Sequence, residues 1–144
     1  MPSNRKSPIL SPEFFERDPL PCERELIGMH LKNGVCSGRI IETEAYREIG
    51  DPACHLFTRP SAREFVRRSA PGTAYVYLNY GVHWLVNVLC HDAETGTSGF
   101  VLFRALEATN GIATMQQRRG SIDARHLCSG PGKLTAALGI GRSH

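Results

Sequence analysis

The alternation of apolar and polar positions predicts a domain built largely from β-strands. Segment Arg39–Tyr46 alternates with a period of two, which indicates a strand with two different faces. Two further runs, Thr73–Leu78 and His83–Cys90, are rich in β-branched and aromatic residues. The turn-forming sequence Asn79-Tyr80-Gly81 separates them, so we expect a β-hairpin with Tyr80 at its tip.

Helices are predicted before and after these strands. A further strand over Phe100–Leu106 precedes the C-terminal helices. The predicted helices are Glu23–Leu31 before an Asn33-Gly34 turn, Ile112–Arg119 capped by Thr109 or Asn110, and a helix opened by Ser129-Gly130-Pro131 that runs to Leu138. Glu48–Arg68 is expected to be irregular or weakly helical.

Length and composition fit one compact domain. The chain has 144 residues with 41% hydrophobic content, and residues 1–12 look like a flexible arm before a domain over 13–144. The most apolar stretch, Tyr75–Cys90, falls short of the roughly 20 residues of a membrane span. No secretory signal follows the N-terminal Met, so we expect a cytoplasmic protein. We also expect a monomer without a membrane partner.

The cysteines and charges bear on cofactors and partners. Five cysteines without a C-x-x-C pair predict reduced thiols, no metal site and no cofactor. The net charge is +3, and basic residues gather in Arg59–Arg68 and in Met115–His144. All but three of the 17 basic residues are arginine, which suits bidentate phosphate contacts. These clusters indicate nucleic acid or a solvated surface.

Candidate chemistry begins on the strand Arg39–Tyr46. Glu42, Glu44 and Tyr46 should share one face of it, and Glu44 is our candidate general base. Glu42 and Glu44 would have Cα atoms about 6.5 Å apart in a strand. A glycoside hydrolase with two carboxylates therefore stays open as an alternative.

Aromatic and amide side chains supply further candidates. Tyr75 and Tyr77 share a strand face, and Tyr46, Trp84 and His55 would complete a cage for a planar or cationic ring, unless these side chains pack in the core. Tyr80 at a hairpin tip suits insertion into a base stack.

Asn87 between valines needs a polar partner or a ligand, and Arg104 lies in a similarly apolar strand. Gly130-Pro131-Gly132-Lys133 lacks the first Gly and the Ser/Thr of a nucleoside triphosphate loop. The N-terminus of the helix after it could receive a DNA phosphate.

Several of these segments, in their order along the chain, resemble the 3-methyladenine (alkyladenine) DNA glycosylase family. The matching segments are I-E-T-E-A-Y (41–46), His55, P-G-T-A-Y-V-Y-L-N-Y-G (71–81), Asn87, V-L-F-R-A-L-E (101–107) and L-C-S-G-P-G-K-L (127–134). The resemblance implies an α/β (α+β) domain with a curved, mostly antiparallel sheet flanked by helices. It also implies base-excision repair: alkylated purines are flipped from duplex DNA and their N-glycosidic bond is hydrolysed.

The resemblance assigns a role to each matching side chain. Glu44 activates water; Tyr46, His55 and Tyr77 line the base pocket; Asn87 disfavours the amine of guanine; Arg104 is a pocket-side cation. Tyr80 is the intercalating wedge, and Arg63 contacts the DNA backbone.

The three lysines do not adjoin Glu44 in sequence, so we expect a monofunctional hydrolase. Family members continue beyond the 127–134 segment, so we expect the C-terminal part of the family domain to be missing. A non-catalytic damaged-DNA-binding module is the alternative.

Overall fold

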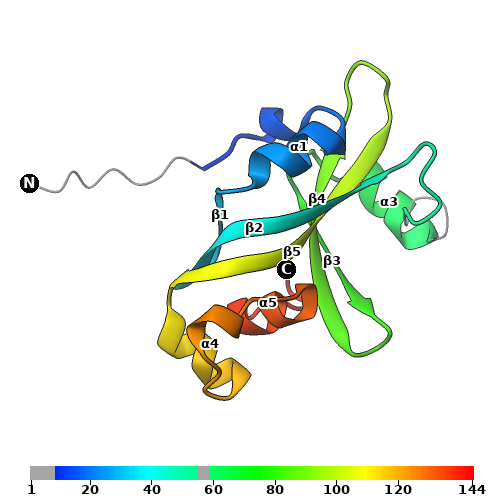
Figure 1. The fold of residues 1–144 in the computed structure, drawn as a ribbon. Coiled ribbons are helices and arrows are strands. Elements are labelled where there is room, and N and C mark those ends of the chain that lie inside the picture. The colour runs from blue at the N-terminus through cyan, green and yellow to red at the C-terminus, as the bar shows by residue number, and fades with distance from the viewer. Residues whose placement is uncertain (1–8, 55–58) are drawn as a thin grey trace, which may run out of the picture.

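The computed structural model describes residues 9–54 and 59–144. A five-stranded sheet with helices on both sides forms the domain (Figure 1). The strands are β1 (His30–Asn33), β2 (Cys36–Arg47), β3 (Ala74–Asn79), β4 (His83–His91) and β5 (Ser98–Asn110). The helices are α1 (Pro19–Leu26), α3 (Pro60–Arg68), α4 (Ile112–Arg119) and α5 (Pro131–Leu138), with 3-10 turns η1 (Pro12–Phe15) and η2 (Ala124–His126). The predicted α+β class with a curved sheet is confirmed.

The sheet has the order β1-β2-β5-β4-β3, and every strand pair in it is antiparallel. A β-bulge interrupts the β2–β5 ladder, because Ile40 pairs with Leu106 while Glu42 pairs with Ala105. Ile41 is the extra residue, and it is 46% exposed. The period-two alternation of side chains between the two faces of β2 is therefore interrupted at Ile41.

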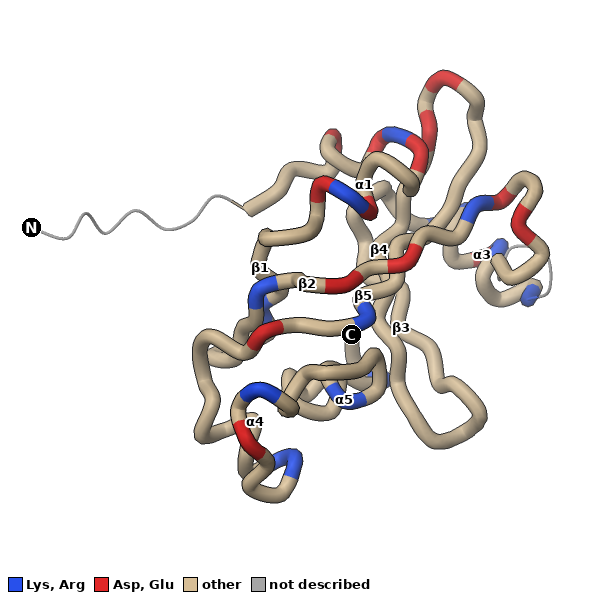
Figure 2. Tube along the Cα trace, in the orientation of Figure 1, with Lys and Arg blue, Asp and Glu red and all other residues tan. Residues whose placement is uncertain are grey.

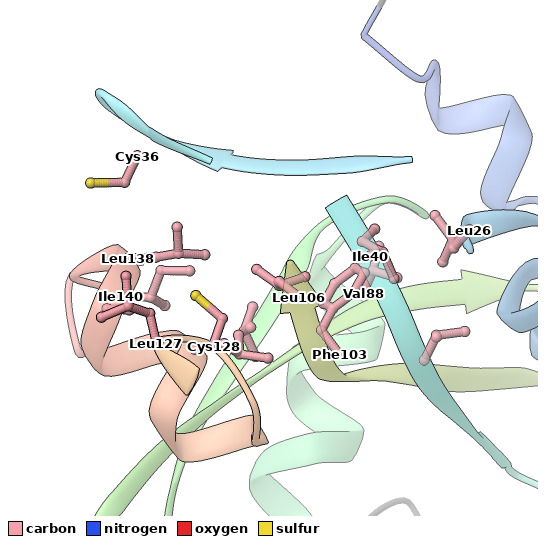
Figure 3. Packing of buried hydrophobic residues seen from close by; sticks show 14 of the residues in the cluster. Leu26, Cys36, Ile40, Val88, Phe103, Leu106, Leu127, Cys128, Leu138 and Ile140 are labelled. Carbon is pink, nitrogen blue, oxygen red and sulfur yellow. The ribbon is translucent and has the colours of Figure 1, made fainter. Parts of the chain in front are cut away.

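Strands β4 and β5 are buried on both faces. The first face of β4 carries Val86 and Val88, which join α1, α4 and α5 in the larger core (Figure 3). The second face carries Leu89, which packs with Phe100 and with Ala62 of α3 in a smaller core. Successive strand residues point to opposite sides, so both cores use the same two strands. The second face supports the candidate site.

Two expectations about the helices are corrected. The predicted helix Glu23–Leu31 is wrong in its bounds, because α1 begins at Pro19 and His30 already starts β1. Asp18 caps α1 by accepting a hydrogen bond from the Leu20 amide, at 2.9 Å. Helix α4 has the predicted bounds, but its N-cap is Gly111 in the left-handed conformation, not Thr109 or Asn110.

The segment Glu48–Arg68, expected to be irregular or weakly helical, contains α3. Pro60 at its first turn favours the helix, and its apolar side chains face the smaller core. Helix α5 has the predicted start and end, with Pro131 in the first turn. Of the predicted flexible arm, residues 1–8 lie outside the described residues, whereas Pro12 begins η1.

Gly99 of β5 packs closely against β2 and the start of α1, and we predict that Gly99→Ala destabilises the fold. An added Cβ would lie 2.5 Å from the carbonyl oxygen of Tyr46 and 2.7 Å from Cγ of Pro19. Relief requires backbone movement, so the free energy of unfolding in urea should fall by about 1–3 kcal/mol. Gly141→Ala is the control, since its Cβ would meet nothing nearer than 3.8 Å. Equal stability of the two variants would contradict this account of Gly99.

Candidate active site

Strands β2 and β5 bring two carboxylates and one guanidinium together. Nη1 of Arg104 lies 2.8 Å from Oε2 of Glu44, and its Nε lies 3.4 Å from Oε1 of Glu42. The Tyr46 hydroxyl donates a hydrogen bond to Oε1 of Glu44, at 2.8 Å. The sequence prediction that Glu42, Glu44 and Tyr46 share a face is therefore confirmed.

Each carboxylate oxygen of Glu44 has its own partner. Tyr46 donates to one oxygen and Arg104 to the other, so the carboxylate plane is held from both sides. The Glu44 side chain is 43% exposed and that of Arg104 is 37% exposed. At such exposure an ion pair contributes little to stability, so orientation of the carboxylate is its main effect. A fixed, solvent-accessible carboxylate is suited to accept a proton from water.

A stack of aromatic rings continues the site on β3 and β5. The Tyr75 ring stacks on Phe100, with ring centroids 4.7 Å apart, and on Tyr77, with centroids 5.5 Å apart. Phe65 of α3 contacts the Tyr75 ring at a tilt. Tyr75 is 7% exposed, so it forms the floor, and Tyr77 stands above it nearer the solvent. Tyr75 packs in the smaller core, as the packing interpretation expected. Tyr77 lines cavities, and its binding of a planar or cationic ring stays a prediction.

The surroundings of the tyrosines keep their hydroxyls protonated. Burial, and next the hydrogen bond to the Glu44 carboxylate, raise the pKa of Tyr46 well above its ordinary value. Burial also raises the pKa of Tyr75 and of Tyr77, while the nearby Arg59 acts in the opposite direction. Tyr46 is thus a hydrogen-bond donor to Glu44 at any physiological pH.

Two cavities meet at Tyr46 and Tyr77. The larger, of about 500 Å³, lies between the β3–β4 hairpin, β5 and the start of α5. Its lining includes the Arg104, His83 and Lys133 side chains. The smaller, of about 120 Å³, is lined by Tyr46, Ala53, Tyr75, Tyr77, Asn87 and Phe100. All four tyrosines of the chain therefore line one cavity or the other.

The hairpin tip presents Tyr80 to solvent. The Val82 amide donates to the Asn79 carbonyl, which closes a tight turn around Tyr80 and Gly81. Both central residues have positive φ, 51° for Tyr80 and 66° for Gly81, as in hairpin turns of type I′. Positive φ is unfavourable for a bulky residue, and Tyr80 is 92% exposed. A strained, exposed aromatic at a tip is a candidate for contact with a ligand.

Asn87 is buried on the face of β4 that carries the site. It is 4% exposed, and its Nδ2 donates to the carbonyl oxygen of Tyr75 at 3.3 Å. Its side chain also lines the smaller cavity. The amide therefore has an internal partner and a position beside the cavity at once, so its role in base selection stays a prediction.

Two further predicted residues, Trp84 and Arg63, lie outside this cluster. Trp84 is on the opposite face of β4, near Gly141, so its predicted place in the cage is wrong. His55 lies outside the described residues. Arg63 is on the exposed face of α3. Sequence reasoning missed His83 and Lys133 as lining residues, because only the fold brings the start of α5 against the hairpin: a Cβ on Gly132 would lie 2.9 Å from the His83 ring.

Within residues 9–54 and 59–144, no group of three or more His, Cys, Asp or Glu side chains is arranged to hold a metal ion. No helix in those ranges has the length and apolar character needed to cross a bilayer.

Comparison with known proteins identifies the class. The sequence profile described as methylpurine-DNA glycosylase matches residues 13–144. The chain belongs to this family.

Relatives from three bacteria carry the name putative 3-methyladenine DNA glycosylase. The Rhodopseudomonas palustris protein is 49% identical over 92% of this chain and 63% of its own length. The Bradyrhizobium diazoefficiens protein is 45% identical over 99% of this chain and 72% of its own length. The Chlorobaculum tepidum protein is 43% identical over 94% of this chain and 66% of its own length. The chain thus spans about two thirds of the length of such relatives.

We predict that Tyr46→Phe weakens the alkaline pH dependence of stability. A hydroxyl whose pKa is raised by folding stabilises the protein below the pKa of about 10 in the unfolded chain, and this contribution is lost as pH rises further. Wild-type unfolding free energy should therefore fall above about pH 10, and more gently in the variant. Chemical denaturation across pH measures both. Parallel curves would contradict the assigned environment of Tyr46.

Proposed function

We propose that this chain is a base-excision-repair DNA glycosylase that flips alkylated purines of the 3-methyladenine class out of duplex DNA and hydrolyses the N-glycosidic bond. The observation that carries the proposal is the oriented Glu44 carboxylate, held by Tyr46 and Arg104 at the edge of cavities lined by tyrosines. Family membership and the names of the relatives support the same activity.

The aromatic rings supply recognition of a damaged purine. Alkylation gives many purines a positive charge, and such a cation is attracted to the face of a tyrosine ring. Tyr46 and Tyr77 offer rings at the junction of the two cavities. His55 joins them by family resemblance. Asn87, on the floor of the smaller cavity, would meet the exocyclic amine of a normal guanine and disfavour it.

Glu44 carries the chemistry of hydrolysis. Water attacks C1′ of the sugar, the glycosidic bond breaks, and the base leaves with the bonding electron pair, so that a cationic purine leaves as a neutral molecule. The Glu44 carboxylate accepts the proton of the water and its charge stabilises the oxocarbenium-like sugar. Arg104 and Tyr46 fix the direction of the carboxylate while this occurs.

The hairpin and α5 form the surface that would meet DNA. Every residue from Ser69 to Cys90 is described and none is Asp, Glu, Lys or Arg, so the hairpin has no carboxylate to repel phosphates (Figure 2). Tyr80 at its tip would fill the space left by the flipped nucleotide. Lys133, in the first turn of α5, faces the larger cavity and would contact a phosphate together with the amides of that turn.

The paired-carboxylate alternative is less compatible with this geometry. Such a hydrolase needs one protonated carboxyl and one ionised carboxylate on either side of the bond that breaks. Here a guanidinium, and not a bond to be cleaved, bridges the two carboxylates, because Arg104 contacts both Glu42 and Glu44.

Glu44→Gln should abolish base release from methylated duplex DNA while binding of the damaged duplex is retained, because the amide keeps the shape and loses the base. Glu42→Gln is the matched control, and we expect it to retain most activity, since the ion pair of Glu42 with Arg104 is long, at 3.4 Å. Gel-based single-turnover assays measure release, and borohydride should trap no covalent complex of a monofunctional enzyme. Equal losses in both variants would favour the two-carboxylate mechanism. Binding without release by the wild type would favour a damage-recognition module.

Tyr80→Ala should weaken binding to lesion-containing duplex by about 1–3 kcal/mol, the scale of one base–aromatic stacking contact. Its thermal stability should change little, because the ring is 92% exposed. Fluorescence anisotropy and thermal unfolding give the two quantities. A large drop in melting temperature without a selective loss of binding would remove Tyr80 from the interface.

A further inference from the structure

Arg59 brings a second positive charge to the aromatic cluster. Its guanidinium carbon lies 5.2 Å from the centroid of the Tyr77 ring, which is within the range of a cation–π contact. Tyr77 lines both cavities, so this cation sits beside the surface that would receive a flipped base. Resemblance to the family assigned a role to Arg63, four residues further along, and none to Arg59.

Local structure holds Arg59 in this position. It is the N-cap of α3, in an extended conformation that the following Pro60 favours. Its carbonyl accepts hydrogen bonds from the Ala62 and Arg63 amides, at 3.1 and 3.4 Å. Ala62 is buried in the smaller core beside Tyr75, so the start of α3 is tied to the floor of the site.

The charge of Arg59 acts on the tyrosines. It opposes the effect of burial on the pKa of both Tyr75 and Tyr77, whereas the Glu44 carboxylate raises the pKa of Tyr77. Tyr77 therefore experiences the charge of a positive group at α3 and of a negative group on β2. A purine placed against this ring would experience both charges.

We propose that Arg59 is a specificity-determining residue: its guanidinium already makes a cation–π contact with Tyr77, competes there with a cationic purine, and so reduces the preference of the aromatic rings for cationic over uncharged damaged purines. The inference rests on the proposed function. A permanently charged purine such as 7-methylguanine must displace or tolerate the guanidinium, while a neutral one such as hypoxanthine experiences no such repulsion. Discrimination follows from this difference between two bound states.

The test compares two lesions in otherwise identical duplexes. Arg59→Met keeps a long apolar side chain against the ring and removes the charge, whereas Arg59→Lys keeps the charge. We expect Arg59→Met to raise the ratio of 7-methylguanine to hypoxanthine release by about three- to tenfold. The ratio should stay near the wild-type value in Arg59→Lys. Arg67→Met, in the same helix and ion-paired with Glu64, is the control for a simple loss of positive charge.

Two outcomes would overturn the assignment of Arg59. The first is an unchanged ratio of 7-methylguanine to hypoxanthine release in Arg59→Met. The second is an equal loss of release of both lesions, which would indicate that Arg59 contacts the DNA backbone instead. If no duplex releases a base, the proposed glycosylase activity fails, and the ratio of the two dissociation constants in the Glu44→Gln background still tests Arg59. If neither lesion is bound, both proposals fall.

Discussion

The antiparallel pairing of β2 with β5 is the constraint on which the site depends. It places Glu44 opposite Leu102, so that Arg104, two residues further along β5, reaches back to both Glu42 and Glu44. The bulge at Ile41 locally changes the register and leaves the two carboxylates on the same side as Arg104. A register slip of one residue would turn every one of these side chains to the other face.

Burial on both faces makes this pairing rigid. The larger core covers one side of β4 and β5, and α3 with the smaller core covers the other. Arg104 on β5 and Asn87 on β4 thus stand on strands that pack against both cores. The side chains of the site are themselves half-exposed, so their ion pairs add little to stability. The fold supplies the stability, and the ion pairs supply the orientation.

Charge is distributed unevenly around the aromatic rings. On the β2–β5 side the two carboxylates of Glu42 and Glu44 outnumber the guanidinium of Arg104. Arg59 and Lys133 add positive charge at α3 and α5. The β3–β4 hairpin between these groups is uncharged (Figure 2). The positive charge around the cavities therefore comes from α3 and α5, and not from the hairpin.

Local signals predicted the elements that short-range chemistry controls. Turn residues marked the hairpin and the exposed place of Tyr80, and Pro131 marked the start of α5, since each effect involves only adjacent residues. The prediction over Glu23–Leu31 was wrong in its bounds because apolar spacing does not separate a short helix from the strand that follows it. The cap of α4 was misassigned because Gly111 takes a left-handed conformation beside Val35 and Cys36, which are distant in sequence.

Alternation along β2 was enough to put Glu42, Glu44 and Tyr46 on one face, and family motifs named most of the pocket. Neither the alternation nor the motifs showed which other groups contact these side chains. The Arg104 bridge, the place of Arg59 over Tyr77 and the approach of Lys133 to the hairpin all join segments far apart in the chain. Trp84 and Asn87 lie three positions apart in β4, so their side chains point to opposite faces of the sheet. The sequence did not show which of these faces carries the site. Periodicity determines which residues share a face, but only packing against the rest of the molecule determines what that face meets.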